Sequence, residues 1–108
     1  MFRHNQCHNL TPHVKFDSSF NPIIPKPNSY IELAYVANNS FKEFNDLQVY
    51  KLIINSKELF ILITDIKCGE KVNLYFYSSL IDVNLIGEKA DIYRYDNKYI
   101  GFGIIREY

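Results

Sequence analysis

The sequence predicts an all-β fold, a small antiparallel β-barrel of six to seven strands with one short helix. Apolar and polar residues alternate with a period of two over residues 72–77 and 81–85, which is typical of strands with one face in a core and one in water. Abundant Ile, Tyr and Phe also favour strands. Short polar segments at residues 55–58 and 96–98 separate apolar runs and have the composition of hairpin turns.

The chain is expected to form one domain preceded by an arm. Residues 1–12 are polar and have no core-forming pattern, so a flexible N-terminal arm is predicted there, and residues 13–108 are predicted to form the single barrel domain. Val14 and Phe16 would lie on one face of a short first strand. Three of the four prolines lie within residues 21–29, which predicts an extended connector.

The middle of the chain is predicted to hold three strands and the helix. The strands are expected over residues 30–37, 47–54 and 59–64. Ser40 and Glu43 have the spacing of a capping box, which predicts a helix of about two turns at most. The third of these strands begins with an unbroken run of five apolar residues. Such a run predicts a strand covered on both faces or the most buried part of a barrel wall.

Residues 67–104 are predicted to form a curved meander of three consecutive antiparallel strands. In the last of these strands, Gly101 and Gly103 lie on the same face. Two glycines on one face weaken a strand unless the space is needed. A bend, a bulge or another backbone passing close by is therefore expected at this position.

The composition limits the classes of function. Twelve basic and twelve acidic side chains give zero net charge, whereas proteins that bind nucleic acid without sequence preference normally have a basic excess, so nucleic-acid binding is disfavoured. No apolar stretch approaches the roughly 18 residues that span a bilayer. Residues 1–10 also lack the apolar segment of a signal peptide. We therefore expect a cytoplasmic protein without membrane insertion, with Cys7 and Cys68 as free thiols.

One part of the sequence resembles a known family. Residues 67–70 carry a lysine, a glycine and a glutamate ahead of an apolar strand, residues 85–87 are Leu-Ile-Gly, and residues 99–103 are Tyr-Ile-Gly-Phe-Gly. This order resembles the second half of the PilZ domain over residues 68–104. The resemblance implies a small barrel in bacterial signalling that binds cyclic di-GMP or acts through a protein partner.

The resemblance also implies where cyclic di-GMP would bind. PilZ domains use an Arg-x-x-x-Arg arm and an Asp/Asn-x-Ser-x-x-Gly motif, because guanidinium groups pair with phosphate and guanine edges and glycine lets the backbone approach the base. Arg3, Asn55 and Ser56 are the matching candidates for ligand binding. Cys7 stands in the place of the second arginine, and the motif glycine is missing. These departures favour protein contacts over tight nucleotide binding.

A metal site in the arm is an alternative use of the same segment. His4, Cys7, His8 and His13 are four metal-competent side chains within ten residues, and thiolate and imidazole donors suit zinc. The other interpretation is a flexible histidine-containing arm. No metal site and no cofactor are predicted.

The functional hypothesis is a PilZ-type signalling module, and no enzyme is expected, because no phosphate-binding Gly-rich loop, nucleophile elbow or zinc-protease motif is present. Two alternatives stay open. One is an adaptor or inhibitor protein on an unrelated small barrel, and the other is a barrel that binds single-stranded nucleic acid by stacking bases on tyrosines. The tyrosines expected to face outward are Tyr75, Tyr77, Tyr93, Tyr95 and Tyr99.

Overall fold

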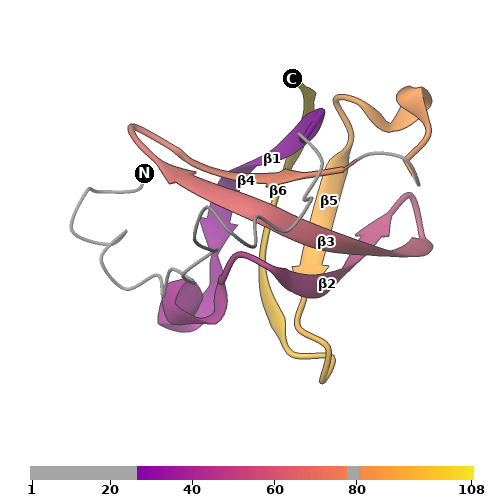
Figure 1. The fold of residues 1–108 in the computed structure, drawn as a ribbon. Helices are drawn as coiled ribbons and strands as arrows, with labels where there is room; N and C mark the ends of the chain where they lie inside the picture. The colour runs from indigo at the N-terminus through magenta and orange to yellow at the C-terminus, as the bar shows by residue number, and fades with distance from the viewer. Residues whose placement is uncertain (1–26, 78–80) are drawn as a thin grey trace, which may run out of the picture.

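The computed structural model describes residues 27–77 and 81–108, which form one closed antiparallel barrel of six strands (Figure 1). The predicted all-β barrel is therefore confirmed. The predicted arm and the predicted short strand at Val14 and Phe16 lie outside the described residues. The elements are β1 Ser29–Val36, η2 Ala37–Glu43, β2 Gln48–Ile54, β3 Lys57–Cys68, β4 Val72–Phe76, η3 Val83–Leu85, β5 Lys89–Tyr93 and β6 Tyr99–Glu107.

The strands follow the order β1-β4-β3-β2-β5-β6 around the barrel. The pairs β2–β3, β3–β4 and β5–β6 are neighbours both in sequence and in space. The predicted meander is wrong at its centre, because β4 and β5 do not pair. Instead β5 pairs with β2, and β4 pairs with β1, which closes the barrel through β6. Closure by distant strands satisfies the backbone groups that an open sheet would leave at its edges.

The strand predicted over residues 81–85 is wrong, because this segment forms the short 3-10 turn η3. The Asp82 side chain accepts a hydrogen bond from the backbone N–H of Asn84, and Val83 is 71% exposed. Asp at such a position offers the backbone a local hydrogen bond that competes with strand pairing. The alternating pattern here marks a connection between β4 and β5.

The predicted helix is present as the 3-10 helix η2, but the predicted capping box is wrong. Val36 precedes the helix and no side chain caps it. Asn38 and Asn39 have φ values of 45° and 59°, and Ser40 lies inside the element and is buried. Asparagine tolerates this left-handed conformation better than most residues, so the asparagine pair sets the turn.

The core fills the barrel with inward side chains from every strand. In β4, for example, Val72, Leu74 and Phe76 are buried while the residues between them are half-buried. Phe41 and Phe44 join the same core from η2 and the residue after it. This alternation confirms the period-two pattern of the sequence. The apolar side chains with no exposed surface are Ile31, Phe44, Leu52, Ile54, Val72, Leu74, Phe76, Ala90, Ile92, Ile100 and Ile105.

The backbones of β1 and β6, which pair in the barrel, approach each other closely at Gly101 and Gly103, as the two glycines predicted. A β-carbon on Gly103 would lie 2.4 Å from the carbonyl oxygen of Glu32 and 2.5 Å from Cγ2 of Ile31. One on Gly101, whose φ is +153°, would lie 2.2 Å from the carbonyl oxygen of Tyr35. No real side chain fits at such distances, so both positions require glycine.

We expect Gly103→Ala to lower the free energy of unfolding by roughly 1–3 kcal/mol, because the added methyl group forces β1 away from β6. Urea denaturation monitored by circular dichroism measures this change. Gly69→Ala is the matched control, since a β-carbon there would lie 4.0 Å from its nearest neighbour, the carbonyl oxygen of Lys71. Equal stability of the two variants would contradict the close approach of β1 and β6.

Candidate functional site

Asn55 and Ser56 form the two-residue turn between β2 and β3. Their φ values are 52° and 65°, and the flanking residues Ile54 and Lys57 are paired, which is the geometry of a type I′ hairpin turn. Both residues are exposed. The hairpin turn therefore fixes the backbone conformation of both residues. Arg3, the third predicted ligand residue, lies outside the described residues, so cyclic di-GMP binding by these residues stays a prediction.

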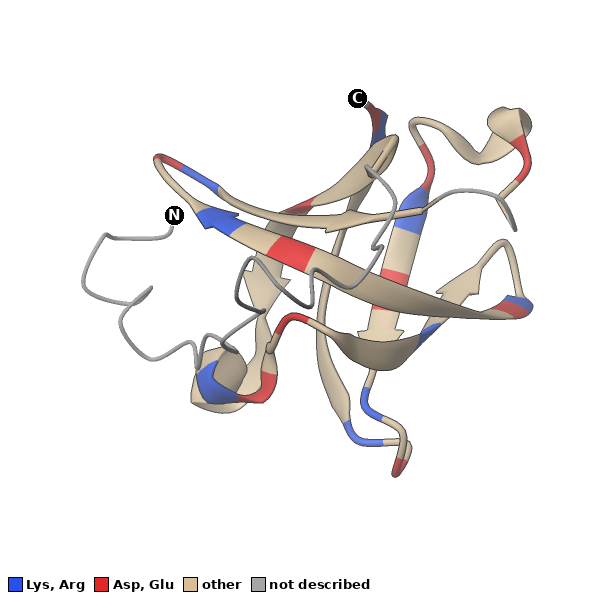
Figure 2. Ribbon diagram, viewed as in Figure 1, with Lys and Arg blue, Asp and Glu red and all other residues tan. Residues whose placement is uncertain are grey.

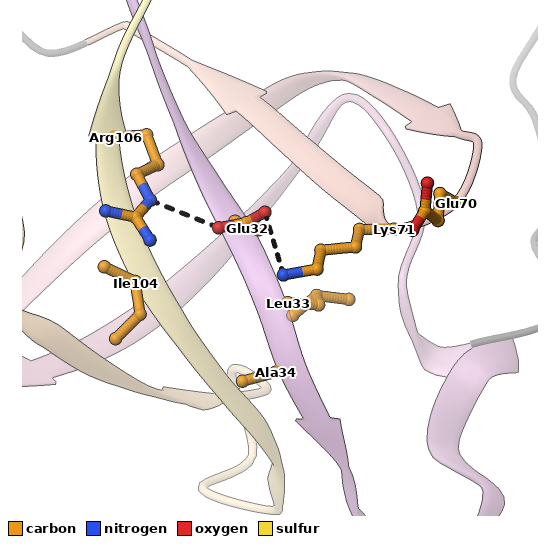
Figure 3. A pocket seen from close by; sticks show the side chains of 7 residues that line it. All are labelled: Glu32, Leu33, Ala34, Glu70, Lys71, Ile104 and Arg106. Carbon is orange, nitrogen blue, oxygen red and sulfur yellow. Dashed lines mark hydrogen bonds and ion pairs between the residues drawn. The ribbon is translucent and has the colours of Figure 1, made fainter. Parts of the chain in front are cut away.

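A hollow of about 310 Å³ lies on the outside of the barrel beside Glu32 of β1 (Figure 3). The Glu32 carboxylate accepts a hydrogen bond from Nε of Arg106 at 3.1 Å and lies 3.3 Å from Nζ of Lys71. Burial raises the pKa of Glu32, but hydrogen bonds from Arg106 and Lys71 outweigh burial and leave this pKa below its usual value. The carboxylate therefore stays ionised and holds two cations beside the hollow.

A second hollow, of about 470 Å³, adjoins the first and shares Glu32, Glu70 and Lys71 with it. Asn73 of β4 lines this second hollow, between its cross-strand neighbours Glu32 on β1 and Lys67 on β3. The side-chain oxygen of Asn73 is covered from solvent and has no hydrogen-bond partner among the described residues. An unsatisfied acceptor of this kind is unusual in a folded protein.

Outward tyrosines pack against one another in two separate groups. The ring of Tyr75 lies 5.0 Å from that of Tyr30 and 5.5 Å from that of Tyr108, measured between centroids. Tyr93 and Tyr99 form another pair at 5.3 Å. Rings that contact each other stabilise the sheet. Stacking of bases on these rings stays a prediction.

The outer surfaces of β2 and β3 carry exposed apolar side chains. Val49 is 49% exposed, Phe60 55% and Leu62 41%, and Val49 lies opposite Leu62 in the ladder. We call these three residues the β2–β3 apolar face. The prediction that the apolar run of β3 is covered on both faces is therefore wrong within the described residues. Figure 2 shows charged residues only toward the ends of β3, which leaves its centre apolar.

A cluster of charges fastens η2 to the β5–β6 turn. The Glu43 carboxylate binds Arg94 and also Lys98, the latter at 3.1 Å, and Arg94 binds Asp96 as well. The hydroxyl of Tyr50 donates to the backbone oxygen of Glu43 at 2.9 Å. Hydrogen bonds from Arg94 and Lys98 hold the pKa of Glu43 below its usual value of 4.5. Because these groups bind each other, we interpret the cluster as a structural clamp.

The predicted thiols and metal donors have different outcomes. Cys68, at the exposed end of β3, is disulfide-bonded, so the expectation of a free thiol is wrong there. His4, Cys7, His8 and His13 lie outside the described residues. Within residues 27–77 and 81–108, no group of three or more metal-competent side chains is present.

None of the helices in this part of the chain has the length and apolar character to cross a membrane.

Sequence reasoning missed the residues around the hollow, because Glu32, Lys71 and Arg106 are far apart in the chain and meet only when β1 lies between β4 and β6. The unbroken apolar run in β3 did indicate the position of the apolar face.

Comparisons with protein-family models, curated proteins and solved structures find no match to this chain. The candidate functional surfaces of the described residues are the charged hollow and the β2–β3 apolar face.

Replacing Glu43 by glutamine tests the clamp through its pH dependence. The pKa of this carboxyl is lower in the fold than its usual 4.5, so its contribution to stability is present above that value and is lost as the pH falls through the folded-state pKa. We expect Glu43→Gln to lower the free energy of unfolding by about 1 kcal/mol at neutral pH, with the difference from wild type vanishing in acid.

Urea denaturation over a pH series measures this difference. Glu58→Gln is the control, because Glu58 is 56% exposed and lies 3.7 Å from Lys51, so its effect should stay below about 0.5 kcal/mol. A difference for Glu43→Gln that stays constant from neutral to acidic pH would show that the clamp is not electrostatic.

Proposed function

We propose that this chain is a PilZ-type signalling module that acts through protein–protein contacts, and that the β2–β3 apolar face is its docking surface. The observation that carries the proposal is the exposure of Val49, Phe60 and Leu62 side by side on two paired strands. Large exposed apolar residues that adjoin one another typically mark binding surfaces. The closed six-stranded barrel is consistent with the resemblance of the sequence to the PilZ domain.

The composition of the face suits a protein partner. Phe60 supplies an aromatic anchor, and Val49 and Leu62 surround it with aliphatic surface. Lys51 and Glu58 form an ion pair of 3.7 Å beside the apolar residues and supply a charged rim of both signs. An apolar centre with a polar rim is the usual anatomy of a protein interface. Because the described strands close into a barrel, the proposed partner contacts the outer face of the sheet.

Tight nucleotide binding has weaker support at the turn between β2 and β3. Asn55 and Ser56 are adjacent, and both adopt the positive φ values that the hairpin requires. The glycine that would bring the backbone close to a base is missing, and Glu58 stands near its place. A carboxylate at this point would repel a phosphate. These features favour the adaptor over the cyclic di-GMP receptor.

Affinity capture with matched variants tests the docking surface. The tagged full-length chain is used as bait in lysate from cells that naturally produce it, and captured proteins are quantified by mass spectrometry. We expect Phe60→Lys and Leu62→Lys each to reduce a specifically captured protein by more than about tenfold, because a charge replaces a central anchor. Equal capture by these variants and wild type would contradict the proposal.

Val83→Lys is the control for the capture experiment. Val83 is 71% exposed on η3, away from β2 and β3, so a lysine there should leave capture unchanged. Because Phe60 and Leu62 are exposed, their lysine variants should change the free energy of unfolding by no more than about 0.5 kcal/mol. Circular dichroism and urea denaturation confirm that a loss of capture is not a loss of folding.

A further inference from the structure

The charged hollow presents hydrogen-bond donors that have no partner within the described residues. Arg106 uses only its Nε to bind Glu32, at 3.1 Å, and its two terminal amino groups make no hydrogen bond to a described residue. These groups lie over Ile104, and Lys71 reaches Glu32 from the other side (Figure 3). A planar guanidinium whose two terminal amino groups are available is well suited to bind a carboxylate. Glu32 thus fixes two cations in place for an incoming anion.

The floor of the same hollow is apolar. Ala34 and Ile104 line it with apolar side chains (Figure 3), whereas Leu33 is 1% exposed and belongs to the core. The ladder between β1 and β6 shifts register between Leu33 and Tyr35, so Ala34 lies at a bulge. Bulges often occur beside binding sites, where they redirect side chains. The small Ala34 side chain leaves room for an apolar group in the hollow.

The second hollow extends the site along β4 and β3. Lys67, Lys71 and Asn73 line it, and the side-chain oxygen of Asn73 is covered from solvent without a partner among the described residues. Counted over both hollows, the cations Lys67, Lys71 and Arg106 outnumber the two carboxylates, Glu32 and Glu70. The surplus of one positive charge comes from Lys67, and the terminal amino groups of Arg106 supply the donors for an anionic ligand.

We propose that the two hollows together bind the C-terminus of a partner polypeptide. Its terminal carboxylate binds Arg106 and Lys71, and its last side chain, which is apolar, occupies the floor over Ala34 and Ile104. The preceding residues run through the second hollow, beside Lys67 and Asn73. The proposal rests on the proposed function, since it specifies how this module recognises part of a protein partner.

A terminal carboxylate fits this site better than an acidic side chain or a free anion. The donors of Arg106 and the floor residue Ile104 are adjacent (Figure 3), so the ligand must carry an anion and an apolar group on neighbouring atoms. The last residue of a polypeptide meets this requirement when its side chain is apolar. Aspartate and glutamate carry their charge at the tip of the side chain, and inorganic phosphate has no apolar group.

The test uses a peptide library displayed with free C-termini and randomised over the last residues. Peptides selected on the full-length protein are synthesised as the free acid and as the C-terminal amide, and both are titrated by calorimetry. We expect selected peptides to end in an apolar residue, and the amide to bind at least about tenfold more weakly, because it loses the charge-assisted hydrogen bonds to Arg106 and Lys71.

Two variants test whether the difference in affinity between acid and amide arises at the hollow. Arg106→Gln should bind acid and amide with similar affinity, and Ala34→Leu should block both peptides by filling the floor. Lys89→Gln is the control, because Lys89 pairs with Asp91 at 3.6 Å and lines neither hollow. Amide proton spectra verify that each variant is folded. The proposal is overturned if acid and amide bind wild type equally, or if the library yields no peptide that binds.

The outcome separates this proposal from the docking face. Phe60→Lys should leave peptide affinity unchanged, because Phe60 lies on β3 outside both hollows. Capture that depends on Phe60 together with equal acid and amide affinities would overturn only the C-terminus site. Acid-dependent peptide binding together with capture unaffected at Phe60 would overturn only the apolar docking face.

Discussion

The close approach of β1 and β6 is the constraint on which the rest of the structure depends. Carbonyl oxygens of Glu32 and Tyr35 occupy the space that β-carbons would fill at Gly103 and Gly101. This contact lets β1 fit between β4 and β6 and closes the sheet into a barrel. The same placement brings Glu32 between Lys71 and Arg106. One backbone contact therefore determines both the enclosed core and the charged hollow outside it.

Closure also bears on where the proposed partner binds. The described strands form a closed barrel, and the proposed recognition uses side chains on its outer faces. Those faces differ in character. The surface of β2 and β3 presents the β2–β3 apolar face, whereas the surface of β1, β4 and β6 presents ion pairs around an apolar floor. A module with two such faces is able to contact a partner at two chemically distinct points.

Local sequence patterns predicted much of the fold, but they did not predict which distant strands pair. Alternation located β4, and the two glycines of β6 predicted the close backbone contact. Residues 81–85 show the same alternation but form a turn, because Asp82 bonds locally. The exposed outer side of β3 was predicted as buried, since an unbroken apolar run is also the pattern of a strand covered on both faces. The hollow was not predicted, because its residues come from three strands that only tertiary structure brings together.

We propose that this chain acts through protein contacts and does not bind cyclic di-GMP tightly. A calorimetric titration of the full-length protein with cyclic di-GMP at moderate salt tests it most directly. The hairpin conformation of Asn55 and Ser56 and the missing glycine predict no measurable heat up to high micromolar ligand. Saturable heat with a micromolar or tighter dissociation constant would contradict the claim and identify the chain as a cyclic di-GMP receptor.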